Sequence, residues 1–215
     1  MRKGVFFLWF LVPFVFSVLA YQGFGFVYKA AVTLSCLLII GLGWKSTSKK
    51  HKETWLIVAA FVLSIVGDWF LSNKGQRFQM FAAGIGFYFL AHVGYLTYAL
   101  QKGSLHKLFT FVLLSFYLLF FALVLWPAID NAVLLFAVLG YLLISCLSLG
   151  AAINLNESSI TKTAYFFGVA LILLSDTIIS FKEFTSYQSL NFLILPTYYA
   201  AHMVISFAVV KAVKD

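Results

Sequence analysis

Charged side chains are scarce in this sequence. Only 10% of its 215 residues are Asp, Glu, Lys or Arg, whereas 63% are hydrophobic. A water-soluble domain of this length needs more polar surface than these residues provide, so that class is excluded. Long polar stretches are missing as well, and apolar runs of roughly 17 to 25 residues follow one another, as a bilayer core demands. Because lipid leaves no partner for unpaired backbone groups, these runs predict an all-α polytopic membrane protein.

Cysteine, proline and the common catalytic motifs are also few or absent. The two cysteines, Cys36 and Cys146, fall inside apolar runs, where we expect small packing side chains without a disulfide. Pro127 lies in a predicted loop and Pro196 lies toward one end of its run, so broken helices are not indicated there. No Gly-x-Ser-x-Gly, His-Glu-x-x-His or Cys–His arrangement is present. Serine, zinc-protease and thiol mechanisms therefore lack support, and no cofactor or metal is expected.

The apolar runs predict eight membrane-spanning helices. They lie near Val5–Ala20, Phe24–Trp44, Thr54–Leu71, Phe78–Leu100, Leu105–Trp126, Ala132–Ile153, Ala164–Phe181 and Leu190–Val213. We interpret the first as an uncleaved span rather than a signal peptide. Because the connections are short, neighbouring helices should pack antiparallel, and residues 1–215 should form a single integral membrane domain.

Basic residues gather on one side of this predicted bundle. Eleven lie on that side: Arg2, Lys3, Lys45, Lys49, Lys50, Lys52, Lys102, Lys107, Lys162, Lys211 and Lys214. Only Lys74, Arg77 and Lys182 lie on the other, and Lys29 lies inside a span. The positive-inside rule then predicts cytoplasmic N- and C-termini, which suits a bacterial inner (cytoplasmic) membrane. Nucleic-acid binding has no support, because the loops are too short to form a binding face.

Five ionisable residues fall inside the predicted spans, where such groups are costly and therefore point to function. They are Lys29, Asp68, His92, Asp176 and His202. From the helical rise, Lys29 and the two aspartates lie roughly 5 to 8 Å from the non-cytoplasmic end, and the histidines about 18 to 21 Å from it. This layering predicts an elongated cavity that is charged toward the outer leaflet and narrows past the midplane.

The two halves of the chain resemble each other. Asp68 and Asp176 are 108 positions apart, and a Tyr-x-x-Ala-His pattern ends at His92 and again at His202. Each pair recurs four helices later, so corresponding helices run in the same direction. This predicts a parallel repeat of four plus four spans, with halves of approximately 1–103 and 104–215. The paired residues would then converge on a central cavity.

Two carboxylates at one depth in a cavity of low dielectric constant should not both stay ionised. One becomes a proton donor beside a carboxylate, a pair suited to hydrolysis through an oxocarbenium-like state. The candidate catalytic residues are thus Asp68 and Asp176. The expected substrate-binding residues are Lys29, Tyr88, His92, Tyr95, Ser175, Tyr198, Tyr199 and His202.

Four segments resemble the YhhN-like lysoplasmalogenase family. They are Ser64–Leu71, Gly84–Tyr95, Gly168–Asp176 and Leu195–Ala201. The resemblance implies hydrolysis of the vinyl-ether bond of lysoplasmalogens, or of a related lysolipid, to a fatty aldehyde and glycerophosphoethanolamine or glycerophosphocholine. It also implies Asp68 and Asp176 as the catalytic pair, with His92 and Tyr95 lining the site. This chain departs from the family where Ala30-Ala31 replaces a usual Pro-Leu and where His202 replaces a frequent Gln.

Two other interpretations remain open at this point. Intramembrane Asp and His residues in parallel repeats also suit a small proton-coupled transporter. His92 and His202 could alternatively be facing ligands of a haem or a metal. The expected partners are a lysolipid substrate and the lipid bilayer, and the oligomeric state is left open.

Overall fold

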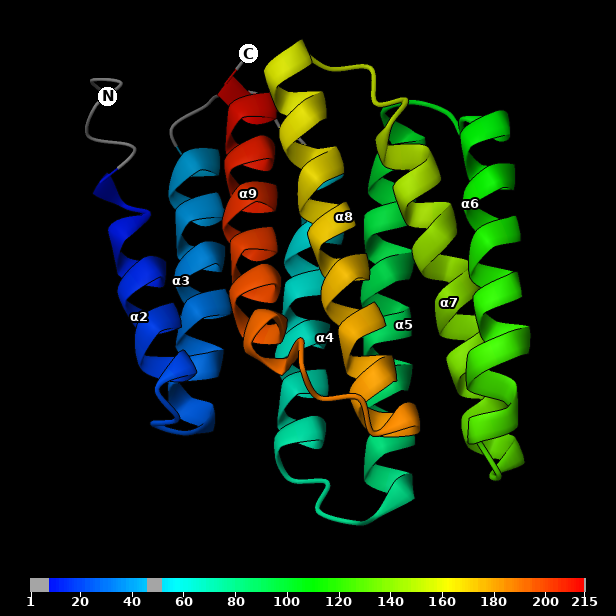
Figure 1. Cartoon of the computed structure of the whole chain (residues 1–215). Helices are drawn as coiled ribbons and strands as arrows, with labels where there is room; N and C mark the ends of the chain where they lie inside the picture. The colour runs from blue at the N-terminus through cyan, green and yellow to red at the C-terminus, as the bar shows by residue number, and fades with distance from the viewer. Residues whose placement is uncertain (1–7, 46–51, 215) are drawn as a thin grey trace.

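The computed structural model describes residues 8–45 and 52–214, and this part of the chain is a bundle of helices without strands (Figure 1). The α-helices are α2 (Leu11–Tyr21), α3 (Phe26–Lys45), α4 (Thr54–Ser72), α5 (Phe78–Gln101), α6 (Lys107–Phe120), α7 (Ala132–Ala152), α8 (Ser159–Ser180) and α9 (Ile194–Lys214). Two π-helical turns, η1 (Phe121–Leu125) and η3 (Phe181–Thr185), extend α6 and α8. Two 3₁₀ turns, η2 (Trp126–Ala128) and η4 (Asn191–Leu193), follow η1 and precede α9.

Side chains cap the N-termini of two helices. The His106 ring accepts a hydrogen bond from the backbone N–H of Phe109 at 3.2 Å, at the start of α6. The Asn131 side chain accepts one from Leu134 at 3.1 Å, at the start of α7. Each cap satisfies a donor that would otherwise lack an intrahelical partner. Both helices therefore begin within a few residues of the predicted positions.

Seven helices in the described residues are long and apolar enough to cross a membrane, so the protein is an integral membrane protein. The predicted first span is represented by α2, which has 11 residues and is shorter than these seven. Residues 1–7, including the start of that predicted span, lie outside the described part. The structure thus supports seven of the eight predicted crossings.

Four helices form the centre of the bundle. Helix α4 packs along α5, and α8 packs along α9, in the two most extensive contacts. On one side α3 packs against α9 and α4, and α2 packs against α3 and α9 (Figure 1). On the other side α7 packs against α5 and α8, and α6 packs against α7. Consecutive helices run antiparallel, so α4 and α8 run in the same direction. These two helices carry Asp68 and Asp176, respectively.

The basic residues separate between the two ends of the bundle. The ends of α3, α5 and α9 and the starts of α6 and α8 share one end in Figure 1. The described lysines there are Lys45, Lys52, Lys102, Lys107, Lys162, Lys211 and Lys214. Lys29, Lys74, Arg77 and Lys182 lie toward the opposite end, where α4 and α8 finish. The asymmetry expected from the sequence is therefore kept in the fold.

Candidate functional site

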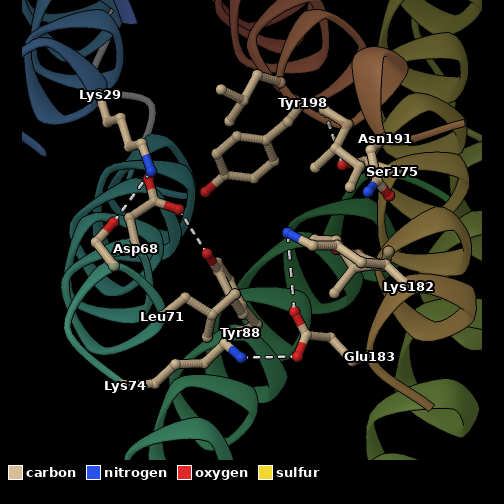
Figure 2. A pocket seen from close by; sticks show the side chains of 15 residues that line it. Lys29, Asp68, Leu71, Lys74, Tyr88, Ser175, Lys182, Glu183, Asn191 and Tyr198 are labelled. Atoms are coloured by element: carbon tan, nitrogen blue, oxygen red, sulfur yellow. Dashed lines mark hydrogen bonds and ion pairs between the residues drawn. The ribbon is translucent and has the colours of Figure 1, made fainter. Parts of the chain in front are cut away.

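A cavity of about 260 Å³ lies near the end of the bundle where α4 and α8 finish (Figure 2). Its walls come from α3, α4, α5, α8, α9 and the segments that connect them. The lining residues are Lys29, Asp68, Leu71, Ser72, Lys74, Tyr88, Ser175, Asp176, Ile179, Lys182, Glu183, Asn191, Ile194, Leu195 and Tyr198. This space can hold a small polar ligand rather than a single water molecule. Both aspartates predicted from the sequence line it.

Asp68 is held by a tyrosine from the neighbouring helix. The Tyr88 hydroxyl of α5 donates a hydrogen bond to Asp68 Oδ1 at 2.5 Å. Gly67 permits this approach, because a Cβ at that position would lie 3.0 Å from the Tyr88 ring. Figure 2 shows the Tyr198 hydroxyl directed toward the same carboxylate. Asp68 is buried, with 8% of its surface exposed, so it faces the cavity and not open solvent.

Asp176 has a different set of partners. The Tyr141 hydroxyl of α7 donates a hydrogen bond to Asp176 Oδ2. His92 Nε2 of α5 lies 3.9 Å from the same oxygen, and the His92 side chain is 1% exposed. The adjacent Ser175 hydroxyl donates to the Ile194 carbonyl at 3.0 Å, which ties α8 to the start of α9. Asp176 is thus fixed by α5 and α7, whereas Asp68 is fixed by α5 and faces α9.

Lysines surround the two carboxylates. Lys29 Nζ of α3 donates to the Ser72 hydroxyl at 3.2 Å. Lys74 Nζ lies 2.7 Å from Glu183 Oε2, and Lys182 Nζ lies 4.0 Å from Glu183 Oε1. Figure 2 shows Lys74 and Lys182 directed toward Glu183, whereas Lys29 lies apart from them, near Asp68. The cavity therefore presents three amines and three carboxylates, an arrangement that can bind a zwitterionic or phosphate-bearing group.

A protein-family model described as the YhhN family matches residues 25–209 of this chain. The chain belongs to the YhhN family. The matched range includes α3 to α8 and most of α9, and thus every residue that lines the cavity. No curated protein and no solved structure matches the chain. The resemblance found in the sequence is therefore confirmed at the level of the family.

The cavity of this YhhN-family protein contains six of the ten predicted site residues. Asp68, Asp176, Lys29, Tyr88, Ser175 and Tyr198 line it. His92 lies behind Asp176, and Tyr95 packs edge-on against His92 with ring centroids 5.5 Å apart. Neither residue lines the cavity. The cavity therefore does not reach the deeper layer of histidines that the sequence predicted for it.

Tyr199 and His202 also lie outside the cavity wall. Tyr199 is buried in an apolar cluster with Ala20 of α2 and Val32 of α3. The His202 ring packs against Phe61 with centroids 4.6 Å apart, and its Nδ1 lies 2.9 Å from the Tyr198 carbonyl. In the described residues, no group of three or more His, Cys, Asp and Glu side chains could hold a metal ion. The sequence placed both residues on the helix that carries Tyr198, but neither side chain lines the cavity.

Sequence reasoning missed Tyr141, Ser72, Lys182, Glu183 and Asn191 as site residues. Part of the signal was available, because Asp-x-x-x-Ser-x-Lys occurs from Asp68 to Lys74 and again at Asp176, Ser180 and Lys182. The repeat therefore extends to the lysines beside the cavity. Tyr141 is the single tyrosine of its predicted span, but nothing in the sequence links it to Asp176. Its role follows from the packing of α7 near α8.

Proposed function

We propose that this YhhN-family protein is a membrane lysoplasmalogenase. It hydrolyses the vinyl-ether bond of a lysoplasmalogen, or of a related lysolipid, to a fatty aldehyde and glycerophosphoethanolamine or glycerophosphocholine. The observation that carries the proposal is the convergence of Asp68 and Asp176 on one cavity, each with a tyrosine hydroxyl bonded to its carboxylate. Family membership supports the same reaction.

The paired carboxylates supply an acid and a base. One aspartic acid protonates the vinyl-ether carbon that does not bear oxygen, and the resulting cation is shared between the other carbon and the ether oxygen. The second carboxylate stabilises this oxocarbenium ion and takes a proton from the water that attacks it. In the last step the hemiacetal hydroxyl gives its proton to the first aspartate, and the second aspartate, now protonated, gives its proton to the departing glycerol oxygen. The C–O bond breaks, an aldehyde and an alcohol leave, and both aspartates return to their starting protonation states. The protons and the bonds of this reaction balance without any cofactor.

The cavity lysines provide a site for the head group. Lys29, Lys74 and Lys182 all line the space that holds the two aspartates. An ammonium group binds phosphate as a point charge, and these three lysines lie near helix ends where they can do so. The Glu183 carboxylate, which pairs with Lys74, can form an ion pair with the cationic nitrogen of the head group. This arrangement supports a phospholipid substrate over an ether without a charged head.

We also propose the finer topology. Eight crossings, cytoplasmic termini and a bacterial inner membrane follow from the charge asymmetry, which would place the cavity toward the outer leaflet. The four-plus-four repeat is supported by matching contacts: α4–α5 corresponds to α8–α9, α3–α9 to α7–α5, and α2–α3 to α6–α7. Lys29 has no counterpart, since position 138 is Val, so the site is asymmetric.

The test is fatty-aldehyde release from lysoplasmalogen by the purified protein in detergent. Asp68→Asn and Asp176→Asn keep the side-chain shape but remove the acid, so each should lower the rate by about a hundredfold or more. Asp130→Asn is the matched control, because Asp130 is an exposed acid outside the cavity. A folded wild-type protein that leaves several lysolipids intact would refute the enzyme, and proton-coupled transport would then be measured.

A further inference from the structure

A second, apolar cavity adjoins the charged one. It lies between α5, α7 and α8, and its walls include Leu71, Phe81, Ile85, Val138, Ile179 and Phe184. The polar residues in its lining are Tyr88, Tyr141, Asp176 and Ser180. Among the residues that the structure describes, no lysine lines it, whereas three lysines line the charged cavity. A ligand bound across both would therefore meet charge at one end and hydrocarbon at the other.

Asp176 stands at the junction of the two spaces. It lines both cavities, together with Leu71, Tyr88 and Ile179, whereas Asp68 lines only the charged one. Near the ion pair of Lys74 and Glu183, the Lys74 ammonium lies 5.1 Å from the centre of the Phe81 ring. The Phe81 ring in turn packs near Phe184. Charged and apolar side chains therefore meet at Asp176 and again at the contact between Lys74 and Phe81. A lysolipid has the same boundary between charged and apolar parts at its ether bond.

We propose that the apolar cavity between α5, α7 and α8, which has a volume of about 60 Å³, binds the first methylene groups of the substrate's single hydrocarbon chain, next to the ether bond. The head group then occupies the charged cavity, and the vinyl ether lies across the junction at Asp176. This inference rests on the proposed function for the identity of the bond, but the chain site itself requires only a single-chain phospholipid. It differs from the sequence-based expectation of a cavity that extends to the layer of His92 and His202, neither of which lines either cavity.

This placement gives the two aspartates different roles. The vinyl-ether carbon that accepts the proton is the one on the chain side, so it lies next to Asp176. Asp176 donates the proton, the alkene electron pair forms the new C–H bond, and the positive charge moves to the carbon–oxygen bond. Asp68, which faces only the charged cavity, takes the proton of the attacking water. The same proton balance holds as in the general mechanism, with each carboxylate now assigned.

Chain-length preference tests the site. Val138 is 7% exposed and lies in the apolar lining, so Val138→Phe would fill part of the cavity. The ratio of kcat/KM for a long over a short alkenyl chain should fall by about tenfold, because several methylene groups lose their contacts. Val133→Phe on the same helix is the control, since Val133 is 64% exposed on the outer surface. An unchanged ratio in a folded Val138→Phe protein would overturn the proposal.

A second measurement uses the wild-type protein and needs no hydrolysis. A lysophosphatidylcholine with a diazirine in its acyl chain is photoreacted with the protein, with and without an excess of unlabelled lysolipid. Competed labels on Phe81, Ile85 or Phe184 are expected. Competed labels that spare all three residues would reject the chain site, whatever the enzyme assay shows. Labelling there without any aldehyde release would reject the proposed reaction and keep the site.

Discussion

Each aspartate of the cavity depends on one tyrosine for its orientation. Tyr88 bonds Asp68 from α5, the helix that packs along α4. Tyr141 bonds Asp176 from α7, across a less extensive contact with α8. Inside a membrane a carboxylate has few other donors, so a single hydroxyl can fix which oxygen faces the substrate. The two carboxylates are thus alike in chemistry but held by different parts of the fold.

Replacing Tyr141 by Phe should lower activity without unfolding the protein. The change removes the hydroxyl that stabilises the negative charge formed on Asp176 as it gives up its proton. A hydrogen bond to a charged group contributes about 1.5 to 3 kcal/mol, so we expect a loss of roughly tenfold to a hundredfold in kcat. Tyr165→Phe is the control, because its hydroxyl bonds the Tyr95 carbonyl at 2.8 Å, away from the cavity. Equal kcat values for the two variants would show that Tyr141 does not position Asp176.

At the residue scale, recurrence between the two halves identified the aspartates, although the recurring Ser72 and Lys182 were missed. The spacing of 108 identified Asp68 and Asp176, and the cavity contains both. The pattern around His92 and His202 placed Tyr88 and Tyr198 correctly but gave no side-chain direction, and both histidines face the packed interior. Tyr141 has no repeated partner, so only tertiary packing brings it to Asp176. A recurring pattern thus identifies residues on each helix, but it does not identify the side chains of other helices that these residues contact.

Close approach of α4 and α5 depends on a glycine in the middle of α5. A Cβ on Gly94 would lie 2.9 Å from the Leu56 carbonyl oxygen and 3.0 Å from the Ala60 Cβ. Helices in membranes gain little from the hydrophobic effect between them, so close backbone packing through small residues is a main source of stability. This contact lies between the two helices that carry Asp68 and Tyr88. Loss of the contact would therefore disturb the site.

Gly94→Ala should destabilise the protein, although Ala is the better helix former. The backbone carbonyl of Leu56 cannot move aside cheaply, and overpacking of this kind costs about 1 to 3 kcal/mol. Gly86→Ala on the same helix is the control, because a Cβ there meets no atom within 4 Å. Thermal unfolding in detergent should show a lower Tm for the first variant and an unchanged or higher Tm for the second. The opposite order would contradict the packing described here.

The sequence predicted most elements but not how two of them end. Seven predicted spans correspond to seven helices, because long apolar runs have few alternatives in a membrane. The π-helical turns η1 and η3 were not expected. The rings of Phe120 and Phe181 pack together where α6 and α8 end, with centroids 5.1 Å apart. One added residue per turn leaves little trace in hydropathy, and such turns are frequent at functional sites. Here η3 carries Glu183 and Phe184, which line the two cavities.

At the scale of the whole molecule, the two halves are joined at the end opposite the cavity. Lys102 Nζ, just after α5, lies 3.1 Å from Glu53 Oε1 and 2.6 Å from Glu157 Oε1. The Asn156 backbone N–H donates to the Lys102 carbonyl at 2.7 Å. Glu53 belongs to the first half of the chain and Glu157 to the second. The lysine therefore ties the segment before α4 and the end of α5 to the loop between α7 and α8.

Lys102→Gln should lower the Tm, because it leaves two carboxylates facing each other without their shared cation. Loss of charge-assisted hydrogen bonds of this kind costs about 1.5 to 3 kcal/mol. Lys107→Gln is the control, since Lys107 is exposed at the same end of the bundle and should change the Tm little.

The pH dependence of this effect has a definite sign. Burial alone would lower the pKa of Lys102, but its hydrogen bonds to Glu157 and Glu53 outweigh burial and raise the pKa above its ordinary 10.5. A raised lysine pKa contributes stability that is fully present below the unfolded value and is lost as the pH rises through the folded value. The Tm difference between wild type and Lys102→Gln should therefore stay constant from neutral pH to about pH 10 and shrink only in stronger alkali. A difference that already disappears near neutral pH would mean that the ion pairs do not hold the two halves together.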